Sequence, residues 1–265
     1  MTTAYGNCWQ FVICYYCENS QAVSRELALT YQEDLMLQGE NLVLTYQDGD
    51  RTLNAVNGVS VAVEDRQFIG ILGPSGSGKS SLLYLLSGLR KPTEGEIFLD
   101  GHAYRKMSDR ERVALRRTEF DFVFQQHFLI NYLTVLENVM VAAPVQDKAH
   151  AAHAQAFLAD LGMGDKLHRF PYELSGGERQ RGAVARAMIH RPRIIFADEP
   201  TGLLDRTTGL QVMALLRGYC QQGSLVAVTH NPELLSEADL VITLRDGQVA
   251  GVKDRLTRVA QGNAK

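Results

Sequence analysis

The strongest constraint on the fold of this chain is a glycine-rich octapeptide that lies between two apolar stretches. It fits the pattern G-x-x-x-x-G-K-S/T and consists of Gly73, Pro74, Ser75, Gly76, Ser77, Gly78, Lys79 and Ser80. Residues 68–72 before it predict a buried strand, and residues 79–89 predict a helix. In this strand–loop–helix context the pattern indicates a phosphate-binding loop.

Glycines in such a loop let backbone N–H groups turn inward around phosphate oxygens, and the N-terminus of the following helix adds partial positive charge. We therefore expect Lys79 to bridge the β- and γ-phosphates of a nucleotide and the Ser80 hydroxyl to bind Mg²⁺. The alternative is a glycine turn that fits the pattern by accident. The strand and the helix on its two sides argue against that alternative.

A second apolar stretch, residues 193–197, ends in two carboxylates, Asp198 and Glu199. A carboxylate at the carboxyl end of a strand beside the phosphate loop can hold Mg²⁺, often through water, so we assign Asp198 to the metal. Glu199 follows where an attacking water would lie and is a candidate general base. Alone, this pattern also fits an acidic turn after a buried strand, because Asp, Glu and Pro often end strands.

A third motif, LSGGE, opens a predicted helix over residues 177–190. Ser175 and Glu178 fit an S-x-x-E capping box, so the motif could serve only to begin the helix. A capping box does not need Gly176 and Gly177, because glycine in the first turn lowers helix stability. Bare backbone at a helix N-terminus lets a phosphate approach closely. We expect a second anion site here, which serves a second nucleotide or a second subunit.

Composition excludes several classes of function. Of the 265 residues 45% are hydrophobic and 22% charged, and the formal net charge is −3, so no global basic field attracts nucleic acid or anionic lipid. No apolar stretch approaches the ~20 residues of a bilayer-spanning helix, so another chain must supply any membrane span. No Lys or Arg precedes Arg25, which argues against a signal peptide. Cys14 and Cys17 have the CxxC spacing of metal and redox sites, but no second pair of ligands follows, so we do not expect either kind of site.

The chain divides into three predicted segments. Residues 1–35 have no sustained periodicity, and we expect a disordered N-terminal extension, with an added edge strand or a small membrane-surface contact over residues 9–16 as the alternatives. One domain is predicted over residues 36–253. Residues 254–265 are predicted to form a loose polar tail.

Within the domain, strands and helices alternate on both sides of an Ala- and Leu-rich segment. This segment, residues 134–168, is predicted to be wholly helical, interrupted at one proline and one glycine. Short antiparallel strands are predicted over residues 42–46 and 53–61. The pattern predicts an α/β fold with a mostly parallel sheet and flanking helices, an antiparallel β subdomain, and an α-helical subdomain inserted at about residues 126–176.

Together these motifs resemble the ATP-binding subunits of ABC transporters, which have a P-loop NTPase core, and the likeness covers roughly residues 40–252. Gln125 resembles the Q-loop glutamine, Asp205 the D-loop aspartate and His230 the switch histidine. Tyr46 stands where such proteins carry the aromatic residue that stacks on adenine. A lone Gln, His or Tyr near a strand is more often structural, but the order of these residues around two strong motifs supports the resemblance.

The resemblance implies a composite site for ATP and Mg²⁺ between two head-to-tail copies of the chain. The loop residues named above, together with Ser81, would hold the nucleotide in one copy. Ser175, Gly176 and Gly177 of the other copy would close on its γ-phosphate. Dimer closure and ATP hydrolysis would then move separate transmembrane permease subunits, which hold the chain at the cytoplasmic face of the inner membrane.

The resemblance also implies individual roles. Gln125 would touch Mg²⁺ and sense the permease, His230 would grip the γ-phosphate, and Asp205 would link the two sites across the dimer. Residues 125–139 are expected to form the docking surface for the permease. Their apolar members are plausible contacts unless they pack inside the helical subdomain; these are Phe128, Leu129 and Tyr132.

A finer likeness is to bacterial ATPases of lipoprotein release, macrolide efflux and glycolipid export, so we expect an export or extraction system. The chain departs from that pattern at Leu203, where Asn is usual, and at His127, where an aromatic residue is common. The main alternative is a non-transport ABC ATPase of DNA repair, translation or cofactor assembly. Such proteins usually carry coiled-coil insertions or duplicated cassettes, which this sequence lacks. A catalytically silent scaffold is disfavoured by intact Lys79 and Glu199.

Overall fold

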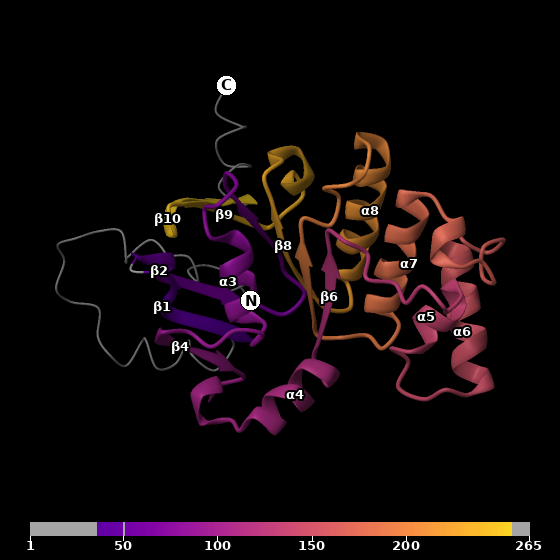
Figure 1. The fold of residues 1–265 in the computed structure, drawn as a ribbon, viewed down its shortest axis with the longest axis horizontal. Helices are drawn as coiled ribbons and strands as arrows, with labels where there is room; N and C mark the ends of the chain where they lie inside the picture. The colour runs from indigo at the N-terminus through magenta and orange to yellow at the C-terminus, as the bar shows by residue number, and fades with distance from the viewer. Residues whose placement is uncertain (1–35, 50, 256–265) are drawn as a thin grey trace, which may run out of the picture.

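The fold is built on two sheets that enclose a shared core (Figure 1). The structure is a computed structural model that describes residues 36–49 and 51–255. The predictions made for residues 1–35 therefore lie outside the described residues, as do those for residues 256–265.

The first sheet is antiparallel, with strand order β2-β1-β4-β5. Its strands are β1 (Leu37–Asp48), β2 (Arg51–Val63), β4 (Glu94–Leu99) and β5 (His102–Ala103). β1 and β2 are longer than the predicted strands over residues 42–46 and 53–61, because their pairing runs from Leu37 opposite Val63 to the end of the hairpin. β1 also pairs with β4 on its other side, so hydrogen bonding extends it beyond its apolar centre.

The second sheet is mostly parallel, with strand order β10-β9-β3-β8-β7-β6. Its strands are β3 (Phe68–Leu72), β6 (Phe120–Phe124), β7 (Ile194–Asp198), β8 (Ser224–Thr229), β9 (Leu240–Arg245) and β10 (Gln248–Asp254). β9 and β10 pair antiparallel, whereas β9, β3, β8, β7 and β6 run parallel. All residues of β7 and β8 are buried, as expected for parallel strands covered on both faces. The predicted α/β fold is confirmed.

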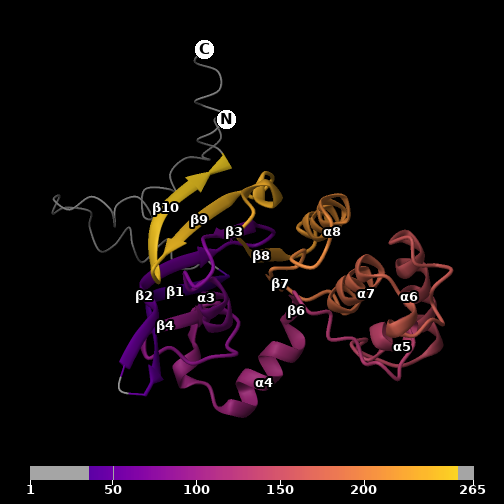
Figure 2. The same ribbon diagram turned by 45° about the horizontal axis from the view of Figure 1, so that its top comes forward.

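Helices cover both faces of the parallel sheet (Figure 2). On one face α3 (Lys79–Leu86) lies between the two sheets and buries four leucines in their common core. On the other face α7 (Gly176–Met188) and α8 (Arg206–Tyr219) pack through residues such as Val184 and Leu216. Successive strand residues point to opposite faces, so Ile194 joins the first core and Ile195 the second. The remaining elements are α4 (Asp109–Thr118), which has no buried residue, and the short 3₁₀ helices η1 (Tyr104–Lys106) and η3 (Pro232–Leu235).

The segment over residues 134–168 is not wholly helical, so that part of the prediction is wrong, but its helices are interrupted at the predicted proline, Pro144, and glycine, Gly162. It contains α5 (Val135–Met140) and α6 (Lys148–Asp160), which are joined and followed by turns. The turn between α5 and α6 ends at Asp147. The Asp147 side chain accepts a hydrogen bond from the His150 backbone N–H and so caps the N-terminus of α6. Gly162, with φ of 69°, ends α6 in a left-handed conformation.

α5, α6 and α7 share a small core of their own, and the 3₁₀ helix η2 (Pro171–Glu173) leads into α7. Figure 2 shows these three helices at the end of the molecule opposite β1, β2 and β4. Within the described part of the chain, no helix has both the length and the apolar character needed to span a bilayer.

Candidate functional site

The predicted site residues lie at one edge of the mostly parallel sheet, where four neighbouring strands end. The phosphate loop follows β3, His230 follows β8, Asp198 and Glu199 follow one another at the end of β7, and Gln125 follows β6. The carboxyl ends of parallel strands meet at one edge of a sheet. Segments far apart in the sequence therefore converge on one site.

The phosphate loop is packed so tightly that two of its glycines accept no side chain. Gly78 is left-handed, with φ of 94°, and a Cβ there would lie 2.0 Å from the carbonyl oxygen of Ala55 in β2. A Cβ on Gly73 would lie 2.4 Å from the carbonyl oxygen of Leu244 in β9. Both sheets thus fix the loop, and these two glycines are required for packing as well as for phosphate access.

Lys79 begins α3, and its ammonium group is buried among loop carbonyls. Nζ donates hydrogen bonds to the carbonyl oxygens of Gly73 and Pro74, both at 3.0 Å, and lies 3.8 Å from Glu199 Oε1. Ser77 Oγ, also buried in the loop, has no hydrogen-bond partner among the residues that the structure describes. A buried cation beside an unpartnered hydroxyl fits an anion with several oxygens, such as a nucleotide phosphate.

Asp198 accepts hydrogen bonds from two hydroxyls of α3. Ser80 Oγ donates to Oδ1 at 2.8 Å, and the Tyr84 hydroxyl donates to Oδ2 at 2.7 Å. Burial, and next the hydrogen bond to Asp198, raise the pKa of Tyr84 well above its ordinary value. Sequence reasoning missed Tyr84, although its position four residues after Ser80 on a predicted helix indicates a shared face. The oxygen donors of Ser80 and Asp198 are of the type that Mg²⁺ prefers.

Glu199 interacts with Lys79 on one side and His230 on the other. His230 Nδ1 lies 3.1 Å from both carboxylate oxygens of Glu199. The Glu199 side chain is 17% exposed and that of His230 is 63% exposed, so the histidine forms the outer end of this row of three side chains. Glu199 has a φ of 46°, which is uncommon for a residue with a side chain, and its N–H donates to the carbonyl of Val228 at 3.0 Å.

Gln125 lies one strand further along the sheet edge and does not join this row. Its side chain contacts Gly202, where a Cβ would lie 2.8 Å from Gln125 Nε2. Among the described residues, it makes no hydrogen bond with Ser80 or Asp198. The chain around it is held from α7, because Gln180 Nε2 donates to the carbonyl oxygen of Phe124 at 3.3 Å.

The LSGGE motif forms the capping box. Ser175 Oγ accepts from the Glu178 N–H at 3.3 Å, and Glu178 Oε2 accepts from the Ser175 N–H at 2.7 Å. Packing accounts for one of the two glycines, because a Cβ on Gly177 would lie 2.6 Å from a methyl group of Thr208 in α8. A Cβ on Gly176 would meet only Leu204, at 3.8 Å, and one backbone oxygen, so the first glycine has no such packing requirement.

Asp205 acts as the N-cap of α8. Its carboxylate accepts hydrogen bonds from the N–H of Thr208 at 3.1 Å and from the hydroxyl of Thr208 at 2.7 Å. The hydroxyl first, and then the N–H, lower the pKa of Asp205. The residue is therefore held ionised at the helix N-terminus, where a negative charge is favourable.

The structure thus divides the predicted site residues into two groups. The first is a set of five residues in two adjoining contacts: Glu199 meets Lys79 and His230, and Ser80 donates to Asp198, with Ser80 next to Lys79 and Asp198 next to Glu199 along the chain. Among the described residues, neither the capping-box serine of α7 nor the N-cap aspartate of α8 has a hydrogen bond to that set. The exposed members of the predicted site include Pro74, Ser75, Gly76, Ser175, Asp205 and, at 37%, Tyr46 of β1.

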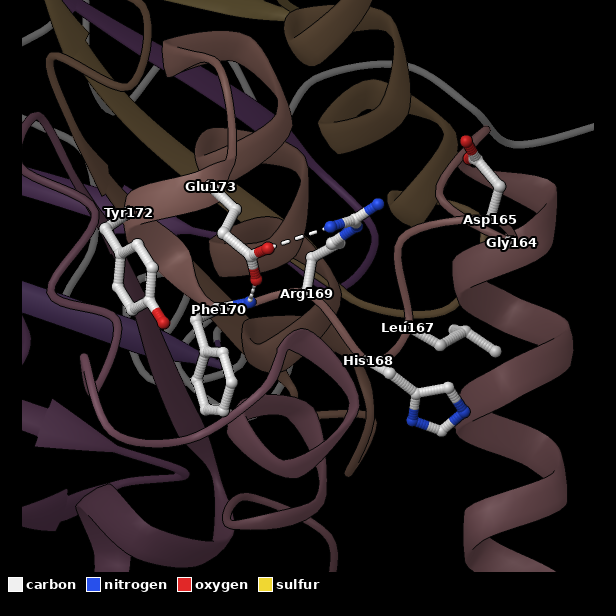
Figure 3. Close-up of a pocket in the computed structure, with 8 residues that line it drawn as sticks. All are labelled: Gly164, Asp165, Leu167, His168, Arg169, Phe170, Tyr172 and Glu173. Atoms are coloured by element: carbon white, nitrogen blue, oxygen red, sulfur yellow. Dashed lines mark hydrogen bonds and ion pairs between the residues drawn. The ribbon is translucent and has the colours of Figure 1, made fainter.

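A cavity of about 430 Å³ lies apart from this set, in the loop between α6 and α7 (Figure 3). The rings of Phe170 and Tyr172 are stacked beside it, with centroids 5.6 Å apart, and Arg169 Nη1 donates to Glu173 Oε1 at 2.8 Å. The loop is tied to α5, because the Val135 N–H donates to the carbonyl oxygen of Arg169 at 2.9 Å. The cavity belongs to the helical part of the molecule rather than to the phosphate loop.

Comparisons with known proteins agree with this geometry. The ABC transporter family matches residues 56–202 of the chain. An ABC transporter ATP-binding protein of Methanocaldococcus jannaschii is 41% identical over 221 residues, which cover 82% of this chain and 99% of that protein. The lipoprotein-releasing system ATP-binding protein LolD of Aquifex aeolicus is 43% identical over 213 residues, which cover 79% of this chain and 94% of LolD.

Among solved structures, the ATP-binding cassette MJ0796, described as a dimer in a post-hydrolysis state bound to ADP and Pi, is 35% identical to this chain. The match has a TM-score of 0.75 and covers 83% of this chain and 98% of that one. A relative of this identity, matched over nearly its whole length, shares the fold and the family. The chain belongs to the ABC transporter family and is an ATP-binding, ATP-hydrolysing subunit of a transporter.

Proposed function

We propose that this chain hydrolyses Mg²⁺-bound ATP between two of its own copies and thereby drives transmembrane subunits of an export or lipoprotein-extraction system. The observation that carries the proposal is that two adjoining contact groups, Lys79 with Glu199 and His230, and Ser80 with Asp198, lie at the carboxyl edge of the parallel sheet. The lipoprotein-releasing ATP-binding proteins among its relatives support the transport class. The site would belong to a domain over residues 36–253, at the cytoplasmic face of the inner membrane.

Phosphate binding is assigned to the loop and to Lys79. In the structure Nζ satisfies its donors with two loop carbonyls and lies 3.8 Å from the Glu199 carboxylate. A buried ammonium group is stable only with such partners. The β- and γ-phosphates of ATP would supply stronger anionic partners to the same group. Tyr46, exposed on β1, is proposed to stack on the adenine.

Metal binding is assigned to Ser80 and Asp198, with Gln125 as a third oxygen donor. When bound, Mg²⁺ neutralises negative charge on the β- and γ-phosphates. Glu199 would accept the proton of the attacking water, and His230, hydrogen-bonded to it in the structure, would orient the carboxylate and contact the γ-phosphate. These groups are supplied by this chain at the ends of four neighbouring strands, with Asp198 and Glu199 both at the end of β7.

A second copy is needed to complete the site. Ser175, Gly176 and Gly177 are proposed to contact the γ-phosphate bound by the partner, because Ser175 is exposed at the N-terminus of α7 and, within residues 36–49 and 51–255, no hydrogen bond joins these residues to the phosphate loop. The dimeric form of MJ0796, which has 34–35% identity to this chain, supports this arrangement. Asp205, at the N-terminus of the neighbouring α8, is proposed to link the two sites across the interface.

The test is nucleotide binding by Lys79→Ala. We expect ATP affinity to fall at least ~10-fold, because the charge at the β- and γ-phosphates is lost. Binding is measured by titration with a fluorescent ATP analogue. Lys91→Ala is the matched control, because the Lys91 side chain is 69% exposed and pairs only with Asp109 on the surface. Unchanged ATP affinity in Lys79→Ala would overturn the assignment of the phosphate loop.

The transport part is tested by co-purification. A tagged chain expressed with the transmembrane protein of its own operon is expected to retain it in detergent and to hydrolyse ATP at a rate that this partner changes. If the chain binds nucleic acid or ribosomes instead and recovers no membrane protein, the non-transport alternative is correct.

A further inference from the structure

The carboxylate of Asp198 is held at both of its oxygens by one helix. Ser80 Oγ donates to Oδ1 at 2.8 Å, and the Tyr84 hydroxyl donates to Oδ2 at 2.7 Å. Ser80 and Tyr84 are one turn apart on α3, so they lie on the same face. Asp198 itself is 8% exposed and ends the buried strand β7.

A second hydrogen-bond donor prevents the rotation of the Asp198 carboxylate that a single donor allows. The terminal torsion of an aspartate side chain is broad and roughly two-fold, so a single hydrogen bond at Oδ1 acts as a hinge about which the carboxylate can rotate. A second donor at Oδ2, fixed to the same rigid helix, defines the plane of the carboxylate. The Ser80 hydroxyl can then direct its lone pairs to a metal while its hydrogen remains on Oδ1.

We infer that Tyr84 is a positioning residue of the Mg²⁺ site, whose hydroxyl holds Asp198 in the orientation that the metal and its bound water need. The inference rests on the proposed function, in which Ser80 and Asp198 bind Mg²⁺ with ATP. Groups that orient metal ligands from behind typically contribute 10- to 100-fold to metal affinity or activity.

The ring and the hydroxyl of Tyr84 have separate roles. The ring is half-buried and packs against the core between the two sheets. The hydroxyl is the part that reaches Asp198, to which it donates a hydrogen bond. Tyr84→Phe therefore removes the contact to Asp198 and keeps the packing.

The structure supplies a matched control. The hydroxyl of Tyr104, which is 4% exposed, also donates to α3, at the carbonyl oxygen of Leu86 at 3.3 Å. Tyr104→Phe thus removes a hydroxyl that ties α3 to its surroundings without touching Asp198. A purely structural role for the Tyr84 hydroxyl predicts that the two variants behave alike.

The experiment measures metal binding rather than turnover. Wild type, Tyr84→Phe and Tyr104→Phe are titrated with a fluorescent non-hydrolysable ATP analogue in the presence of Mg²⁺ and in EDTA, and the spectrum of Mn²⁺ bound with that analogue is recorded by electron paramagnetic resonance. In Tyr84→Phe we expect unchanged affinity in EDTA, a roughly 10-fold weaker apparent metal affinity, and an altered Mn²⁺ spectrum. Tyr104→Phe is expected to match wild type in all three measurements.

The possible results distinguish a failure of the proposed metal site from a failure of the role given to Tyr84. If the binding of the analogue to wild type does not depend on Mg²⁺, the proposed metal site fails, and the role of Tyr84 fails with it. If wild type depends on Mg²⁺ but Tyr84→Phe equals it, or falls no further than Tyr104→Phe, only the role of Tyr84 is overturned. Tyr84→Leu, which also keeps an apolar side chain, replaces Tyr84→Phe if that variant does not fold. In an Asp198→Asn background, the effect of Tyr84→Phe is expected to disappear.

Discussion

At the residue scale, Glu199 has competing partners on two sides of its carboxylate. Its carboxylate lies 3.8 Å from Lys79 Nζ and 3.1 Å from His230 Nδ1. In the structure it is the anion nearest to the lysine that is assigned to phosphate. ATP binding would therefore require Lys79 to exchange this carboxylate for phosphate oxygens, and the freed carboxylate would be close to the reacting γ-phosphate.

Glu199→Gln tests this arrangement. We expect ATP affinity to be retained or increased, because a competing anion is removed, and hydrolysis to slow by ~10²-fold or more, because the general base is lost. With ATP and Mg²⁺ the variant is expected to elute as a dimer on gel filtration. Glu94→Gln, at an exposed position that begins β4, is the control for a change of charge. Normal hydrolysis by a monomeric Glu199→Gln would mean that another residue activates the water.

The stability of the protein is expected to depend on pH through the carboxyl group of Asp121. Burial raises the pKa of Asp121, on β6, to about 7, while the Phe122 N–H donates to its Oδ1 and Arg186 opposes the shift. His190 Nδ1 lies 3.4 Å from Oδ2, and burial lowers the pKa of that histidine. In the unfolded chain an aspartate has a pKa of about 4. Between these two values the native state binds the extra proton, so this carboxyl loses its stabilising contribution as the pH rises towards 7.

Asp121→Asn removes this dependence. We expect the difference in unfolding free energy between wild type and Asp121→Asn to be more favourable to wild type at about pH 5 than at about pH 7, by about 2 kcal/mol. Urea denaturation at the two pH values gives the difference. Asp246→Asn, whose parent side chain is 94% exposed, is the control. An equal difference at both pH values would mean that Asp121 is ionised in the native protein throughout this range.

At the element scale, α7 connects the LSGGE motif to the segment that follows β6. Arg186 Nη1 donates to the carbonyl oxygen of Phe128 at 2.7 Å, and Nη2 donates to that of His127 at 3.3 Å. The ring of His127 also meets the side chain of Gln180. One helix therefore holds the chain next to Gln125 while its own N-terminus is available to a second copy.

Arg186→Ala is expected to release that segment. Two carbonyl oxygens lose a charged donor, so we expect stability to fall by about 2 kcal/mol and hydrogen exchange in residues 125–134 to accelerate. Exchange followed by mass spectrometry locates the change. Arg179→Ala is the matched control, because Arg179 donates in the same way to the carbonyl oxygen of Leu174 at 2.7 Å. That variant should accelerate exchange before the LSGGE motif instead, and identical exchange patterns would contradict the role given to Arg186.

The elements that could be predicted from sequence are those whose signal is local. The strand, glycine loop and helix around Lys79 follow one another directly, and so do the apolar strand and carboxylates at Asp198. The break between α5 and α6 contains Pro144, where an interruption is predicted, but its length is set by the cap Asp147 within a segment whose composition favours helix. The contacts of Tyr84 and Gly177 depend on which strand or helix lies beside them, and this order is set by long-range packing that no local pattern contains.

At the scale of the whole molecule, the surface proposed to meet the permease is residues 125–139, which lead from β6 into α5. Phe128 and Tyr132 are 60% and 80% exposed, as a docking surface requires. Leu129 instead packs against α7, 3.7 Å from where a Cβ on Gly182 would lie. The prediction that residues 125–139 dock on the permease therefore retains two of its three apolar contacts, and Leu129 fits the alternative of internal packing.

Crosslinking tests this surface in the assembled transporter. With Cys8, Cys14, Cys17 and Cys220 replaced by alanine, a cysteine at the exposed position Asn131 is expected to form an adduct with the transmembrane subunit when both are expressed together. A cysteine at Gln222 is the control, because it lies between α8 and β8 at the amino ends of the parallel strands, opposite the nucleotide site. Adduct formation at Asn131 alone would support docking through residues 125–139. An intact complex with no adduct at Asn131, or with equal adducts at both positions, would move the permease contact to another face of the molecule.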